Sequence, residues 1–185
     1  FKNVISNSQT IWNGIMAAGL TQVAQKLYEI SLNSAKFEVL SQNFGKQFGG
    51  NVELAEEQLS KFRTATAGNV TDANLIKLSN QASDLGISLK DQTVLFSLAE
   101  DASDKYGTSL EEGFQKVMYA TEGSGKGLKE LGIQKEVYKE IVDKLALAHG
   151  KEIDQLDAET QKEIRIQAII KASGVSYEDA THKVK

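Results

Sequence analysis

Three stretches with one pattern decide the fold: GISLKD at residues 86–91, GTSLEE at residues 107–112 and GVSYED at residues 174–179. Each stretch reads glycine, one residue, serine, two residues and then an acid. Glycine takes the left-handed conformation that ends a helix without steric cost. Serine caps the next helix, and the carboxylate three residues later reaches back to the cap. Each stretch therefore predicts a tight corner between two helices.

The segments between these corners have the spacing of short amphipathic helices. Apolar residues recur three or four positions apart, which is typical of a helical face. Such stripes begin at four positions: Val52, Leu75, Val94 and Leu110. GNVTDAN at residues 68–74 is a looser corner with Thr71 as its cap, and further helices are expected over residues 137–149 and 157–174. No segment alternates as a half-buried strand does, so the sequence predicts an all-α fold.

A longer apolar stripe lies near the start of the chain. It runs over residues 12–48, with the polar residues Ser31, Asn33 and Ser34 where a helix could break, and it stops at Gly49. A helix unbroken from about Ser8 to Phe48 would extend about 60 Å, which is more than a small core can cover. We therefore expect a long N-terminal helix, followed by a cluster of short helices joined by tight turns. Its exposed stripe, including Phe37 and Phe44, is expected to pair with another copy or a neighbouring protein.

This pattern divides the 185 residues into three parts. They are a long amphipathic helix over residues 1–50, a compact helical core over residues 51–133 and further helices over residues 134–185. The chain begins with Phe1 rather than methionine. We therefore expect it to be a piece cut from a longer protein.

The composition excludes several classes of function. The chain contains no cysteine, which excludes disulfides, thiolate nucleophiles and cysteine-ligated metal sites. A formal net charge of -4 gives no general attraction to nucleic acid, and we find no basic patch that would compensate. The most apolar run, at residues 11–20, is shorter than the ~20 residues that span a membrane. The sequence therefore predicts no sequence-specific nucleic-acid partner, no small-molecule substrate and no membrane contact.

The glycine-rich stretch GSGKG at residues 123–127 is the strongest candidate for a ligand site. Successive backbone amides and Lys126 would suit an anion. A phosphate-binding loop, however, has glycine five residues before its Gly-Lys pair and serine or threonine directly after it. Those positions hold Ala120 and Gly127. We therefore interpret the stretch as a flexible loop that leads into a single helical turn ending at Gly132.

The remaining reactive side chains are explained by helix structure. His149 and His182 are expected to cap helix ends or to face solvent. The prominent serines are interpreted as caps rather than nucleophiles. Two acidic groups alternate with lysines, as on a solvated helix face: Glu53, Glu56 and Glu57, and Glu100, Asp101 and Asp104. The sequence thus predicts no enzyme and no catalytic, cofactor-binding or metal-ligating residue.

The order of the motifs over residues 62–133 resembles the N-terminal core of bacteriophage tail tape measure proteins. Each motif is weak alone, and their order and spacing carry the likeness. The matching residues are Arg63, Ala65, Thr66, Gly68, Val70, Leu85, Gly86, Ile87, Gly107, Ser109, Glu111, Glu112, Gly123, Leu128, Leu131, Gly132 and Ile133. The stretch LDAETQKEIRIQAII at residues 156–170 is similar to the continuation of that family.

The resemblance implies a structural role in a phage or prophage tail. Tape measure proteins are long helical chains packed inside the tail tube, where their length sets tail length, and they leave the tube when DNA is delivered. The expected partners are other copies and other tail or tail-assembly proteins. The expected location is the virion tail, assembled in the bacterial cytoplasm. No catalytic residue carries over, and this chain lacks the long downstream helical ruler of a full family member.

Two other classes of function stay open from the sequence alone. One is a helical binding or adaptor module unrelated to phage. The other is an anion- or nucleotide-binding helical domain that uses the GSGKG stretch. Ligand binding to the native state must raise its stability, so a thermal shift with phosphate or nucleotide distinguishes the second class. The adaptor class is distinguished by the genes that lie beside the parent reading frame and by the length of that frame. Tail genes beside a very long reading frame would favour a tape measure protein.

Overall fold

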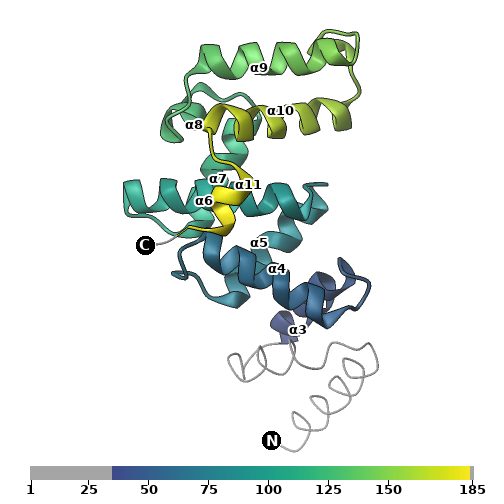
Figure 1. Ribbon diagram of the computed structural model, residues 1–185, viewed down its shortest axis with the longest axis vertical. Helices are drawn as coiled ribbons and strands as arrows, with labels where there is room; N and C mark the ends of the chain where they lie inside the picture. Colours follow the sequence, from purple (N-terminus) through teal and green to yellow (C-terminus); the bar gives the residue numbers. More distant parts are fainter. Residues whose placement is uncertain (1–34, 184–185) are drawn as a thin grey trace, which may run out of the picture.

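The computed structural model describes residues 35–183, and every regular element within them is a helix (Figure 1). No strand occurs in that range, so the predicted all-α class is confirmed there. The elements are α3 (Ala35–Lys46), α4 (Val52–Ala65), α5 (Asp72–Asp84), α6 (Leu89–Tyr106), α7 (Leu110–Thr121), α8 (Gly125–Glu130), α9 (Lys135–Ala148), the 3-10 turn η1 (Ile153–Gln155), α10 (Ala158–Ser173) and α11 (Tyr177–Thr181).

The predicted corners form as the sequence indicates. Gly86, Gly107 and Gly174 all have positive φ angles, of 75°, 63° and 72°. Three caps follow them, with serine hydroxyls accepting the backbone N–H three residues on: Ser88 from Asp91, Ser109 from Glu112 and Ser176 from Asp179. The capping box is complete at the second and third of these corners. Local sequence therefore determines where these helices end and begin.

Only the end of the predicted N-terminal helix falls within the described residues. Helix α3 ends at Lys46, and its last residues continue as hydrogen-bonded turns up to Asn51, which caps α4. The rest of the predicted helix, including the Phe37 side chain, lies outside what the structure describes. The length of that helix therefore stays a prediction.

A row of phenylalanine rings joins four helices through the middle of the molecule. The ring centroids of Phe44 and Phe62 are 6.4 Å apart, those of Phe62 and Phe96 are 4.8 Å apart, and those of Phe96 and Phe114 are 5.6 Å apart. All four side chains are at most 1% exposed. The prediction that Phe44 lies on an exposed pairing stripe is therefore wrong, because α4 and α5 cover α3 and enclose this ring.

The C-terminal helices fold back onto the centre of the molecule. Helices α9 and α10 lie side by side, and α10 also packs against α7 and α6 (Figure 1). Helix α11 packs on α6 and α4. One hydrophobic cluster accordingly extends from Phe44 to Ala180. The proposed division into three parts is not tested by this packing and stays a prediction.

Candidate functional site

The GSGKG stretch is not the open loop that the sequence suggested. Ser124 caps α8 by accepting the N–H of Gly127 at 3.4 Å, and Gly125 is already the first helical residue. Gly127 is buried against α7, where an added Cβ would lie 2.6 Å from the backbone nitrogen of Ala120. The stretch is therefore a helix start pressed against its neighbour, and the interpretation as a flexible loop is wrong.

Both histidines lie exposed at helix ends, as predicted. His149 is the C-terminal cap of α9, and His182 is that of α11. The Nδ1 atom of His182 lies 2.9 Å from the backbone oxygen of Glu178. Within residues 35–183, no group of three or more histidine, aspartate or glutamate side chains could hold a metal ion. In the same range no helix is long and apolar enough to cross a membrane.

One predicted surface carboxylate is buried. Glu100 is 3% exposed, whereas its neighbours Asp101 and Asp104 are exposed as expected. Its Oε1 accepts a hydrogen bond from Asn69 Nδ2 at 2.8 Å, and its Oε2 lies 3.4 Å from the Ser103 hydroxyl. The prediction of a solvated face is wrong for Glu100, because the corner between α4 and α5 brings Asn69 over this side of α6.

The main polar feature that the sequence did not reveal is centred on Gln92, in the first turns of α6. Its side chain is fully buried. Its Nε2 donates to the Ser83 hydroxyl at 2.9 Å and to the backbone oxygen of Ile87 at 2.8 Å. Its Oε1 accepts from the Ser79 hydroxyl at 2.7 Å. One amide thus joins α6 to two hydroxyls of α5 and to the backbone of the corner between the two helices.

The same hydrogen bonds continue from α5 to α3. The Ser83 hydroxyl donates to Gln47 Oε1 at 2.7 Å, and Gln47 Nε2 donates to Asn80 Oδ1 at 3.0 Å. Asn80 Nδ2 then donates to the backbone oxygen of Leu40 at 2.7 Å. We call the set Gln47, Ser79, Asn80, Ser83 and Gln92 the amide network. It links three helices through neutral groups that do not titrate.

A separate buried pair joins α4 to α6. Gln58 is 7% exposed, and its Nε2 donates to the Thr93 hydroxyl at 3.0 Å. That hydroxyl donates in turn to the backbone oxygen of Leu89 at 3.0 Å. Buried polar groups of this kind cost free energy unless they are paired. Here the Gln58 amide nitrogen and the Thr93 hydroxyl are paired across the interface between α4 and α6.

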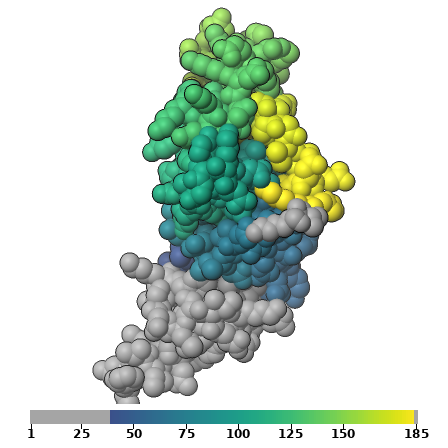
Figure 2. Space-filling model, turned by 90° about the vertical axis from the view of Figure 1, so that its left-hand side faces the viewer, coloured from purple at the N-terminus to yellow at the C-terminus, as the bar shows by residue number. Residues whose placement is uncertain are grey.

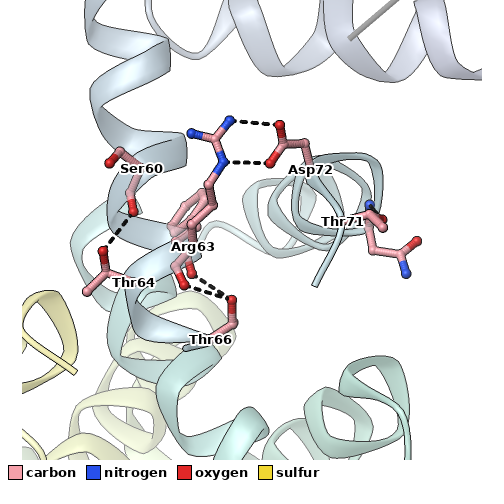
Figure 3. Close-up of polar contacts among 8 residues, drawn as sticks. Ser60, Arg63, Thr64, Thr66, Thr71 and Asp72 are labelled. Carbon is pink, nitrogen blue, oxygen red and sulfur yellow. Dashed lines mark hydrogen bonds and ion pairs between the residues drawn. The ribbon is translucent and has the colours of Figure 1, made fainter. Parts of the chain in front are cut away.

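An ion pair fastens α4 to α5 at the corner between them (Figure 3). Arg63 donates from Nε to Asp72 Oδ1 and from Nη2 to Asp72 Oδ2, each at 2.7 Å. The Asp72 carboxylate raises the pKa of the Arg63 guanidinium through these hydrogen bonds. The Thr66 hydroxyl donates to the backbone oxygen of Phe62 at 2.9 Å. The two parallel hydrogen bonds between Arg63 and Asp72 fix the orientation of the two side chains as well as the distance between them.

The chemistry of these groups favours a role in positioning the helices rather than a role in catalysis. The amide network, the Gln58–Thr93 pair and the Arg63–Asp72 pair each direct their donors to another helix of the same fold. They set how α3, α4, α5 and α6 lie against one another. Comparisons with protein-family models, with curated proteins and with solved structures give no match for this chain.

Proposed function

We propose that this chain is a structural helical segment of a phage or prophage tail tape measure protein. In that role it takes part in tail assembly and in setting tail length, and the whole protein also acts in genome delivery. The observation that carries the proposal is the order of the motifs over residues 62–133. The proposal assigns the chain no catalytic residue, no cofactor and no metal.

The positions of the matching residues support this proposal. Gly68, Gly86, Gly107 and Gly132 have positive φ angles at corners between helices. Amino acids other than glycine are strained at such φ angles, so each of these glycines is explained by the backbone conformation. The shared pattern is therefore a pattern of corners and of the apolar positions between them. Such a pattern describes an architecture rather than a reactive site.

The proposal extends to residues 1–50, where we propose a long amphipathic helix that ends with α3 at Lys46 and pairs with another copy or with a tail protein. Phe44 takes no part in that pairing, since its ring is enclosed by the chain's own helices. The apolar stripe that precedes it in the sequence supplies the pairing surface. Sedimentation of the chain over a range of concentrations tests this part, and a strict monomer at high concentration contradicts it.

The main proposal is tested on the particles that the parent gene's host produces. Mass spectrometry of purified tails should recover peptides of this chain, and an in-frame deletion in a helical region of the parent protein outside it should shorten the tail. A helix rises 1.5 Å per residue, so removal of 60 residues should shorten the tail by about 90 Å. Tails of unchanged length, or tails without the chain, would overturn the proposal.

A further inference from the structure

The end of the described chain forms a strap across the helices that it covers. Residues 175–183, comprising α11 with its flanking residues, cross α4 and α6 (Figure 1). In the space-filling view this C-terminal segment lies as a separate ridge along the side of the molecule (Figure 2). We call residues 175–183 the strap.

Polar contacts hold the strap at both of its ends. Lys183 Nζ donates to the backbone oxygen of Ser97 at 3.1 Å, to its hydroxyl at 3.2 Å and to Asp101 Oδ1 at 2.6 Å. At the other end, Lys90 Nζ lies 5.7 Å from the centroid of the Tyr177 ring. Contacts of this kind at a partly exposed rim contribute little to stability.

The strap buries less apolar surface than the helix before it. Ala180 is the single fully buried residue of α11, and Val175 and Tyr177 pack against the core while partly exposed. In contrast, α10 buries Ile164, Ile166, Ala168 and Ile169. The capping box that Ser176 and Asp179 form lies within the strap itself and does not attach it to the core. A segment with few buried apolar contacts opens at a lower free energy than the core.

We propose that the strap opens as a unit while the other helices stay folded. The hinge is Gly174, whose φ of 72° marks the junction between α10 and α11. Lys90, Ser97 and Asp101 mark the face of α6 that the strap covers, and Val94 falls on the same face by helical spacing. Val94 is 2% exposed and Ser97 is 3% exposed in the closed state. Opening uncovers this face of α6.

The absence of cysteine from the sequence allows a direct test by thiol labelling. Ala180 in the strap and Ala168 in α10 are both 0% exposed, so Ala180→Cys and Ala168→Cys form a matched pair. Under native conditions the thiol at position 180 should react with iodoacetamide at least about 100-fold faster than the thiol at position 168. Only local opening of the strap is needed to expose position 180, whereas α10 must unfold to expose position 168. Equal labelling rates for the two thiols would overturn the proposal.

A second substitution tests the anchor at Lys183. Lys183→Met, made in the Ala180→Cys background, keeps the apolar stem and removes the ammonium group. Labelling at position 180 should rise about five- to tenfold, as expected for loss of partly exposed charge-assisted contacts. Because the Lys183 contacts are lost both when the strap opens and when the chain unfolds globally, labelling at position 168 should rise by about the same factor from its much lower rate, whereas Lys139→Met on α9 should change neither rate. Unchanged labelling at position 180 in the Lys183→Met variant would show that Lys183 does not hold the strap closed and would contradict its role as the anchor.

Hydrogen exchange of the unmodified chain makes the same comparison without any substitution. Amides of residues 177–183 should exchange faster than those of α6, and their exchange should depend little on denaturant at low concentration. If the strap amides exchanged only with those of α6, the strap would be part of the global unit and the proposal would fail. This readout holds even if a cysteine variant does not fold.

Discussion

Helix α6 meets its neighbours α7 and α5 through two different kinds of interface. Against α7 the contact is a close approach of backbones, because a Cβ at Gly113 would lie 2.1 Å from the backbone oxygen of Ala99. Against α5 the contact is made by the buried amide of Gln92 and the hydroxyls of Ser79 and Ser83. Steric fit fixes the separation of the first pair, and hydrogen-bond direction fixes the alignment of the second.

The difference between the two interfaces shows what each can tolerate. Two backbones in contact cannot yield without moving whole helices, so an added atom must be accommodated by separation of α6 and α7. A hydrogen-bonded amide adds little net stability, yet its loss leaves several buried groups unpaired. We therefore expect the interface between α6 and α7 to be destabilised by an added atom. The interface between α6 and α5 should be destabilised when a hydrogen-bond partner is removed.

The largest expected effect comes from Gly113→Ala. The new methyl group overlaps backbone atoms of α6, so we expect a loss of about 3 kcal/mol or more in the free energy of unfolding. Gly125→Ala is the matched control, since nothing lies within 4 Å of a Cβ at that helical position. Chemical denaturation measures both. If Gly113→Ala were as stable as the control, the close backbone approach would not govern this interface.

A smaller loss is expected from Gln92→Leu, which keeps the approximate size of the side chain but none of its hydrogen bonds. The Ser79 and Ser83 hydroxyls and the backbone oxygen of Ile87 each lose a partner. We expect destabilisation of about 2–3 kcal/mol. Ser79→Ala should cost less in this background than in the unmodified chain, because the hydroxyl is already unpaired there. Strictly additive losses in denaturation would rule out the coupling.

The sequence was informative about the corner between α6 and α7 and silent about the interface between α6 and α5, for a physical reason. Corners are local, so Gly107 and Ser109 could be interpreted from neighbours within a few residues. Gln92 stands in the polar run Lys90–Thr93, and only Ser79 and Ser83 on another helix reveal that it is buried. A glutamine amide can form hydrogen bonds with water or with buried polar groups, and the spacing of residues along the helix does not show which environment it has.

Glu100 and Gly113 illustrate the same limit in different ways. Glu100 lies beside two exposed acids in sequence, so the helical pattern placed it in solvent, whereas Asn69 from a distant corner covers it. Gly113 did carry a usable signal, because glycine within a helix costs about 1 kcal/mol relative to alanine. Such a cost indicates a packing reason, which the Ala99 backbone supplies. That signal could have identified the α6–α7 contact in advance.

The ion pair between Arg63 and Asp72 tests whether a charged contact behaves like the amide network. Side-chain exposures of 39% and 15% place it between the surface and the interior. Arg63→Met should cost about 1 kcal/mol, discounted for solvent screening. In contrast, Lys144→Met removes a highly exposed pair with Glu140 and should give no measurable change in denaturation midpoint. Equal effects of the two substitutions would contradict the role assigned to the two parallel hydrogen bonds.

The smallest expected effect concerns an exposed cap that belongs to neither interface. Asp157 accepts the backbone N–H of Thr160 at 2.9 Å and its hydroxyl at 2.7 Å, and these hydrogen bonds lower the pKa of the Asp157 carboxyl. Because the folded pKa lies below the unfolded one, the charge stabilises the folded state above the unfolded pKa of about 4. That contribution is lost as the pH falls through the lower folded pKa.

Asp157→Asn isolates this charge, since asparagine keeps the capping oxygen and removes the titrating group. The unmodified chain should unfold at a slightly higher denaturant concentration than the variant at pH 6, where the carboxylate also favours the N-terminus of α10. The difference should shrink as the pH falls from about 4 through the lower folded pKa, because below that pKa the side chain at position 157 is neutral in both chains. Other carboxylates titrate equally in the two chains and cancel. A difference that persisted unchanged at pH 2 would assign the effect to the shape of the cap rather than to its charge.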